Sequence, residues 1–206
     1  RFWYALVSSG GQYGAGSGAR CPMNPMKNAP NLRNLLADRE AWDLLTRLYD
    51  ERAPGESFIA YFWTFRFMHL PIWQVMAASP RVPAARVYHS VSTGYAGLLG
   101  AVLRARRARP LLLTEHGIYT KERKIEIAQA EWIHAARQQG FVAFQGLGYL
   151  KELWTRCFGF MGRAAYEAAD AITTLYDGNR RMQIEHGAPP EKIQVIPNGI
   201  DVEEMG

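Results

Sequence analysis

The sequence predicts an α/β fold, a Rossmann-like parallel sheet with a helical insertion. From residue 85 onward, short apolar runs alternate with helical stretches, a pattern typical of parallel βαβ units. The 206 residues are 48% hydrophobic and 21% charged, which suits one sizeable core but not two full Rossmann domains. We expect residues 1–84 to hold a strand, a glycine-rich linker and the insertion, and residues 85–206 to form the Rossmann-like part of the same domain.

The chain is expected to open with a short strand from Phe2 to Ser8, followed by a glycine-rich segment over residues 10–18. A phosphate-binding loop must lead into a helix, whose N-terminal amides meet the phosphate. Here Pro22 and Pro25 follow, and the GxGxxG spacing is missing. A flexible linker is therefore the favoured interpretation, and a phosphate loop is the alternative.

Two helices are predicted before residue 85, from Asn31 to Arg52 and from Ser57 to Ala78. The first carries leucines at three- and four-residue spacing. The second is rich in aromatic residues and nearly long enough to span a bilayer, but Arg66 and Pro71 argue against a span. We favour a helix buried against its neighbour. The alternative is a face that docks on a membrane or a membrane protein.

Four strands and four helices are predicted after residue 85. Right-handed crossovers between parallel strands would make them half of an open sheet with helices on both faces. In chain order they are the strand Arg86–His89, the helix Thr93–Arg107, the strand Pro110–Thr114, the helices Glu122–Gln139 and Leu150–Ala169, the strand Ala171–Leu175, the helix Asp177–His186 and the strand Ile193–Ile196.

Composition narrows the class of function. The net charge of +5 is spread along the chain apart from an arginine cluster over residues 104–109, and no nucleic-acid recognition motif accompanies it, so no nucleic-acid partner is expected. Cys21 and Cys157 form neither a disulfide framework nor a zinc motif, which favours a reducing, cytoplasmic location. The chain starts without methionine and is expected to be cut from a longer protein.

Two histidines are predicted at the ends of neighbouring strands. His89 closes one strand and His116 follows the next, and ligands of open parallel sheets bind beside the carboxyl ends of strands. Such a pair can donate hydrogen bonds to sugar hydroxyls or phosphate oxygens. For each histidine alone, the alternative is a structural imidazole ring that makes its hydrogen bonds to backbone groups.

The loop after the second strand combines a carboxylate, an imidazole, a glycine and basic residues. Lys121 and Arg123 begin a predicted helix, where cations oppose the helix dipole, so either an anion is bound there or the residues form a solvated face. Glu115 could orient an attacking hydroxyl or steady positive charge at a sugar carbon. It could equally pair with Lys121 or Arg123. Further along, Asn198 and Gly199 predict a tight turn.

Several of these segments resemble retaining glycosyltransferases of family four, which have the GT-B fold. The resemblance rests on Ala169-Asp170-Ala171-Ile172-Thr173, on Gly187 before Pro189, and on Ile193-Gln194-Val195-Ile196-Pro197-Asn198-Gly199-Ile200-Asp201. These segments are similar to the end of the family's N-terminal domain. The resemblance implies that the sheet is the N-terminal half of a GT-B fold and that a donor domain follows Gly206.

The resemblance also implies the site and its substrates. A nucleotide sugar, UDP-linked, would bind between two domains without metal or other cofactor, and a growing exopolysaccharide would be the acceptor. The implied catalytic residues are His116 and Glu115; the implied acceptor-binding residues are His89, Ser90, Gly117, Tyr119, Lys121 and Arg123; and the implied interdomain turn holds Asn198, Gly199 and Asp201.

The fragment alone is then expected to be inactive, because it lacks half of the cleft. A different class of function stays open, a non-catalytic module that binds the acceptor or serves as a scaffold for membrane-embedded partners. In both cases we expect a cytoplasmic protein, with association to the inner face of the cytoplasmic membrane in the scaffold case.

Overall fold

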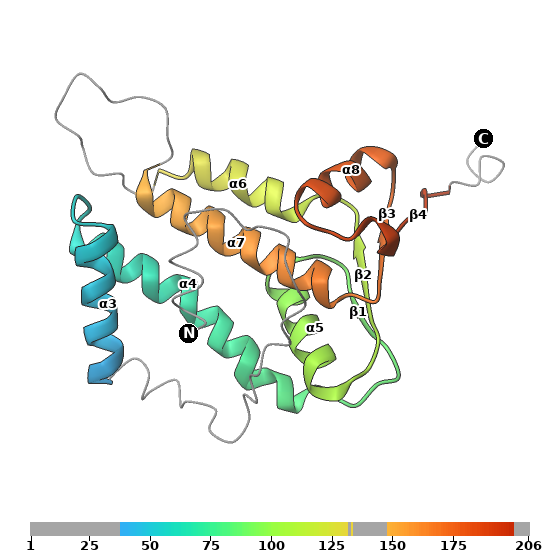
Figure 1. Cartoon of the computed structure of the whole chain (residues 1–206), viewed down its shortest axis with the longest axis horizontal. Coiled ribbons are helices and arrows are strands. Elements are labelled where there is room, and N and C mark those ends of the chain that lie inside the picture. Colours follow the sequence, from blue (N-terminus) through green and yellow to red (C-terminus); the bar gives the residue numbers. More distant parts are fainter. Residues whose placement is uncertain (1–37, 132, 134–147, 200–206) are drawn as a thin grey trace. The chain divides into compact units, whose positions relative to one another are not determined.

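The computed structural model describes residues 38–131, 133 and 148–199, and it has a mixed α/β fold with a four-stranded parallel sheet (Figure 1). The chain divides into unit 1, residues 1–73 and 131–153, and unit 2, residues 74–130 and 154–206. The predicted strand from Phe2 to Ser8 and the glycine-rich segment lie outside the described residues. The predicted division at residues 84 and 85 stays a prediction.

Unit 1 contains α3 (Arg39–Arg52) and most of α4 (Phe58–Ala78). Asp38 begins α3 by accepting a hydrogen bond from the backbone N–H of Glu40 at 3.2 Å, as an N-cap residue does. At the other end of the helix, the Tyr49 hydroxyl donates to the carbonyl of Glu56 at 2.7 Å and closes the turn between α3 and α4. The predicted helix from Ser57 is confirmed, and the one ending at Arg52 is confirmed from Arg39 onward.

Unit 2 is built on the sheet. Its strands pair in the order β1-β2-β3-β4, all parallel, with Thr114 opposite Thr173 in the register of the central pair. The elements are β1 (Tyr88–Ser90), α5 (Gly94–Arg107), β2 (Leu111–Glu115), α6 (Tyr119–Gln129), α7 (Tyr149–Ala168, from Trp154 in this unit), β3 (Ala171–Thr174), α8 (Asp177–Glu185) and β4 (Ile193–Val195), with 3₁₀ turns at Ser79–Arg81 and Pro190–Lys192.

The described helices of unit 2 cover one face of the sheet. The strand order advances in a single direction, and right-handed crossovers then place every connecting helix on the same side. Leu111, Leu113 and Ile172 are at most 2% exposed, in a core with Leu103 of α5 and Tyr166 of α7. Figure 1 shows α5 and α7 on the same side of the strands.

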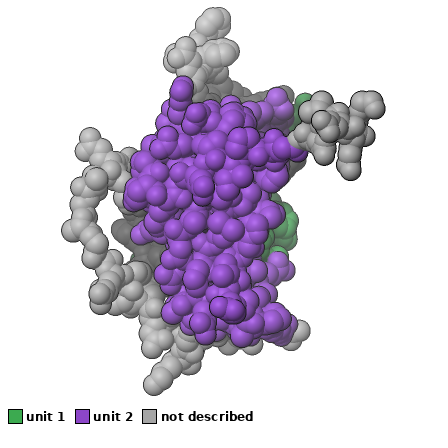
Figure 2. Space-filling view, turned by 90° about the vertical axis from the view of Figure 1, so that its right-hand side faces the viewer, with its two compact units in different colours: residues 1–73, 131–153 green, residues 74–130, 154–206 purple. Residues whose placement is uncertain are grey.

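Along the strands, the residues between these buried ones are partly or fully exposed: His89, Leu112, Thr114, Ala171, Thr173 and Gln194. We call this side the open face. Figure 2 shows the surface of unit 2 from the side on which the strands lie in Figure 1. The expectation of helices on both faces is therefore wrong for the described part of the chain. It would have required a strand order that reverses direction.

The helix predicted from Glu122 to Gln139 differs from the structure at both ends. The helix α6 begins three residues earlier, where the Ile118 carbonyl accepts from the backbone N–H groups of Lys121 and Glu122. It ends at Gln129, because the backbone of Ala130 is extended (φ −66°, ψ 116°). The strand predicted from Arg86 likewise begins only at Tyr88.

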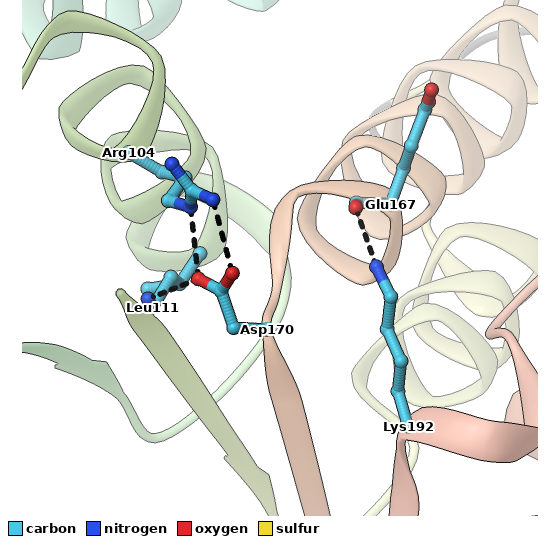
Figure 3. A network of polar contacts seen from close by, with 5 residues as sticks. All are labelled: Arg104, Leu111, Glu167, Asp170 and Lys192. Carbon is cyan, nitrogen blue, oxygen red and sulfur yellow. Dashed lines mark hydrogen bonds and ion pairs between the residues drawn. The ribbon is translucent and has the colours of Figure 1, made fainter. Parts of the chain in front are cut away.

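Asp170 fastens the amino-terminal edge of the sheet (Figure 3). Its carboxylate accepts from Arg104 Nε at 2.8 Å and Nη2 at 3.0 Å, and from the backbone N–H of Leu111 at 2.8 Å. The backbone N–H of Asp170 in turn donates to the Leu111 carbonyl at 2.9 Å. The aspartate of the Ala-Asp sequence before β3 therefore joins the end of α5 to the start of β2. Its role is to stabilise the folded domain.

Asp170→Asn is expected to remove a pH-dependent part of the stability. The hydrogen bond from Arg104, followed by the one from Leu111, holds the Asp170 pKa below its usual value of 3.8. A lowered pKa contributes stability above the unfolded-state pKa, and the contribution is lost as pH falls through the folded-state pKa. The urea midpoint of the wild type should exceed that of Asp170→Asn by more near about pH 6 than near about pH 3. An equal gap at both pH values would contradict the role given to this carboxylate.

Candidate functional site

The carboxyl ends of the four strands meet at one edge of unit 2, which we call the carboxyl edge. Parallel pairing makes all strands end on the same side, and ligands of open parallel sheets bind there. Large side chains are exposed in the loops that leave this edge: Val91 after β1, Tyr176 after β3 and Ile196 after β4 are 66%, 54% and 49% exposed. His116, directly after β2, is also exposed.

Glu115 ends β2 and is 1% exposed. Three uncharged side chains donate to its carboxylate: the Thr93 hydroxyl at 2.9 Å, the Tyr166 hydroxyl at 2.6 Å and the Gln183 amide at 3.0 Å. The Thr174 hydroxyl also donates to its backbone carbonyl at 3.3 Å. A buried carboxylate is normally compensated by hydrogen bonds or a cation, and here neutral donors fill this role.

Its partners give Glu115 a structural position. Thr93 precedes α5, Tyr166 lies on α7 and Gln183 lies on α8, so one carboxylate joins three helices beneath the end of β2. The alternative that Glu115 pairs with Lys121 or Arg123 is wrong, since its hydrogen bonds go to these neutral groups and Arg123 pairs with Glu126. The side chain belongs to the packed face and is almost closed to solvent.

His116 is held by its backbone and offers its ring to solvent. Its carbonyl accepts from the Asn179 amide at 2.9 Å, and Asn179 is 1% exposed. At the next position, a Cβ on Gly117 would meet only the flexible end of Glu122, so packing does not require a glycine there. The result is a fixed main chain with an exposed imidazole at the carboxyl edge.

His89 lies within β1, on the open face, rather than at the strand end. Its Nε2 is 2.9 Å from the Thr114 hydroxyl, which is 2.6 Å from the Thr173 hydroxyl. A row of three hydrogen-bonding side chains thus crosses β1, β2 and β3. Neither threonine was among the predicted site residues, although Thr114 stands two residues from Leu112 and so shares its face. The hydrogen bond of His89 goes to Thr114, not to His116.

Ser90 is buried and donates to the Ser92 carbonyl at 2.7 Å.

Lys121 and Arg123, in the first turns of α6, have protein partners. Arg123 lies 5.2 Å from the centre of the Tyr119 ring and forms an ion pair with Glu126, and Lys121 Nζ is 3.6 Å from the sulfur of Met182. Tyr119 itself packs edge-on to Phe158, at 5.9 Å between ring centres. The anion-binding role of these two cations stays a prediction.

Asn198 and Gly199 follow β4 without regular secondary structure, and Asp201 lies outside the described residues. Just before them, the backbone N–H of Ile196 donates to the Thr174 carbonyl at 2.7 Å, which extends the contact between β4 and β3.

Burial raises the pKa of the Cys157 thiol to about 12, so this thiol is protonated and unreactive.

The described residues contain no cluster of three or more His, Cys, Asp or Glu side chains arranged to hold a metal ion. Among the helices of residues 38–131 and 148–199, none is both long and apolar enough to cross a membrane.

The parallel sheet, its connecting helices and the exposed carboxyl edge define a Rossmann-like α/β domain. More particularly, the chain belongs to the family described as "Domain of unknown function (DUF3492)", whose model matches residues 20–191. This domain family is found in glycosyltransferase-like proteins. No curated protein matches the chain.

Proposed function

We propose that the parent protein is a retaining glycosyltransferase that resembles PelF, the cytoplasmic enzyme of Pel exopolysaccharide biosynthesis. It would transfer a hexosyl unit from a UDP-sugar to the growing polymer. The observation that carries the proposal is the exposed His116 on a fixed main chain at the carboxyl edge, in a domain family found in glycosyltransferase-like proteins. The motifs shared with family four add support.

We assign different roles in the transfer reaction to the residues at this edge. The acceptor hydroxyl attacks the anomeric carbon of the donor while the bond to the UDP oxygen breaks. The hydroxyl proton passes to the departing diphosphate oxygen, and the sugar keeps its configuration. We assign His116 to contact the sugar, where an imidazole can donate a hydrogen bond to a hydroxyl or phosphate oxygen. Glu115 is assigned to position β2 and the loop after it, because its carboxylate is occupied by three donors. The donor diphosphate would be bound by the domain that follows, without metal.

His116→Ala in the parent protein is expected to lower the rate of sugar transfer by about a hundredfold, as the loss of one transition-state donor does. Its unfolding midpoint should stay unchanged, because the ring is exposed and only the main chain is hydrogen-bonded. The test is the release of UDP from a panel of UDP-sugars. The matched control is His186→Ala, which removes a different imidazole. The Nδ1 atom of His186 lies 2.9 Å from the hydroxyl of Thr120 on α6. Equal rates in the wild type and in His116→Ala would contradict the role of His116.

The alternative is a scaffold for the membrane-embedded proteins of the Pel complex, at the inner face of the cytoplasmic membrane. A stripe on α4 favours it, since Ile59, Trp63 and Phe67 follow at four-residue spacing and are 69%, 46% and 50% exposed. Polymer secretion by cells that carry His116→Ala separates the two functions. A scaffold would keep secretion, whereas an enzyme would lose it.

A further inference from the structure

A pocket of about 420 Å³ opens between α3 and α4, within the size range of ligand sites. All of its lining residues belong to unit 1 and none belongs to the carboxyl edge. The function proposed above makes no use of it.

Aromatic rings make up much of the lining, from Trp42 on α3 and from Phe62, Phe65 and Trp73 on α4. Trp42 is 49% exposed, and its ring packs against two neighbouring rings. Its centre lies 5.8 Å from that of Phe58, edge-on, and 6.1 Å from that of Phe62. A flat indole supported in this way is a preorganised surface for stacking, because little side-chain freedom is left to lose on binding.

The imidazole of His69 also lines the pocket. Charged residues of both signs complete the lining, two carboxylates from Asp38 and Glu40 and two guanidinium groups from Arg47 and Arg66. Their charges cancel, so the pocket does not select an anion or a cation. Ala41, Leu44 and Leu45 are its aliphatic residues. A site for a lipid chain or an apolar peptide would instead be lined mainly by aliphatic side chains, since burying charged groups against hydrocarbon is unfavourable.

A neutral sugar matches both parts of this lining. The C–H bonds on one side of a pyranose ring form an apolar surface that packs on an aromatic face, while its hydroxyls donate to carboxylates and accept from guanidinium groups. We propose that the pocket between α3 and α4 binds a short stretch of neutral glycan, with Trp42 as the stacking platform. The ligand class follows from the lining. That the site would hold the growing polymer rests on the proposed function.

The test is calorimetric titration of the chain with short oligomers of glucose and of N-acetylglucosamine. At least one of them should bind, and Trp42→Ala should weaken that binding by about tenfold or more, which corresponds to about 1.4 kcal/mol. Trp42→Phe keeps a smaller ring and should give an intermediate affinity. The matched control is Phe67→Ala on α4, which removes a ring of similar exposure (50%) that does not line the pocket. Its affinity should stay within about twofold of the wild type.

Binding of neither oligomer by the wild type would overturn the proposal, and so would equal weakening by Trp42→Ala and Phe67→Ala. Displacement of a pocket-bound apolar dye by fatty acid but not by sugar would also overturn it, in favour of an apolar ligand. These outcomes do not depend on sugar transfer. Oligomer binding without transfer by the parent would refute the proposed function alone, and transfer without binding to the pocket would refute this inference alone.

Discussion

Glu115→Ala should lower the free energy of unfolding by about 3 kcal/mol or more. The change leaves three buried donors, on Thr93, Tyr166 and Gln183, without their acceptor, and each unsatisfied group costs about 1 kcal/mol or more. It also opens a cavity under the end of β2. Urea unfolding followed by circular dichroism measures the effect.

Glu115→Gln is the matched control and should cost only about 1 kcal/mol. The two donors on Oε2, from Tyr166 and Gln183, keep an oxygen if the new amide places its nitrogen at the Oε1 position. The Thr93 hydroxyl can then turn and accept from that nitrogen. If Glu115→Ala does not fold, Tyr166→Phe removes a single donor and should lower the stability by about 1 kcal/mol. Similar stability of the Ala and Gln variants would contradict the structural role of this carboxylate.

Gly94→Ala should lower the free energy of unfolding by about 2 kcal/mol or more, through two effects. The backbone of Gly94 has φ +72°, a region that an L side chain enters at a cost of about 1 kcal/mol. In addition, a Cβ would lie 3.0 Å from Cδ1 and Cζ of the Tyr119 ring and would overlap Cε1. Because Gly94 follows β1 and Tyr119 begins α6, the glycine lets the loop after β1 approach α6 beside the carboxyl edge.

A second substitution separates these two effects. Tyr119→Ala in the Gly94→Ala background removes the overlap but not the strained φ, so part of the loss due to Gly94→Ala should disappear. The control is Gly55→Ala, where an added Cβ meets nothing within 4 Å, and its stability should stay within about 0.5 kcal/mol of the wild type. Gly94→Ala and Gly55→Ala of equal stability would contradict the packing described at Gly94.

Local patterns predicted most of the elements. The helix α5 lies within one residue of its expected start, because Thr93 and the apolar spacing that follows are local signals. The single-sided cover of the sheet was not predicted, since it depends on strand order, which periodicity does not encode. The early end of α6 was missed for a similar reason, because its apolar spacing continues past Gln129 while Ala130 becomes extended.

The candidate site was predictable only in part. His116 was expected beside a strand end and lies there, exposed. The surroundings of Glu115 were out of reach, because its donors stand 22, 51 and 68 residues away in sequence. From sequence alone, a carboxylate in a polar loop is interpreted as a functional group, because its hydrogen-bond partners are not known. The pocket between α3 and α4 was missed as well, since its aromatic residues have the same spacing as residues of a buried helix face.

The most direct test of the proposed function is the configuration of the transferred sugar. The parent protein would be incubated with an α-linked UDP-sugar and a short glycan acceptor, and the anomeric proton coupling of the product would be read by NMR. We expect an α-linked product, formed by the wild type and nearly absent with His116→Ala. A β-linked product, or a UDP-sugar that remains unconsumed across the panel of sugars, would contradict a retaining glycosyltransferase.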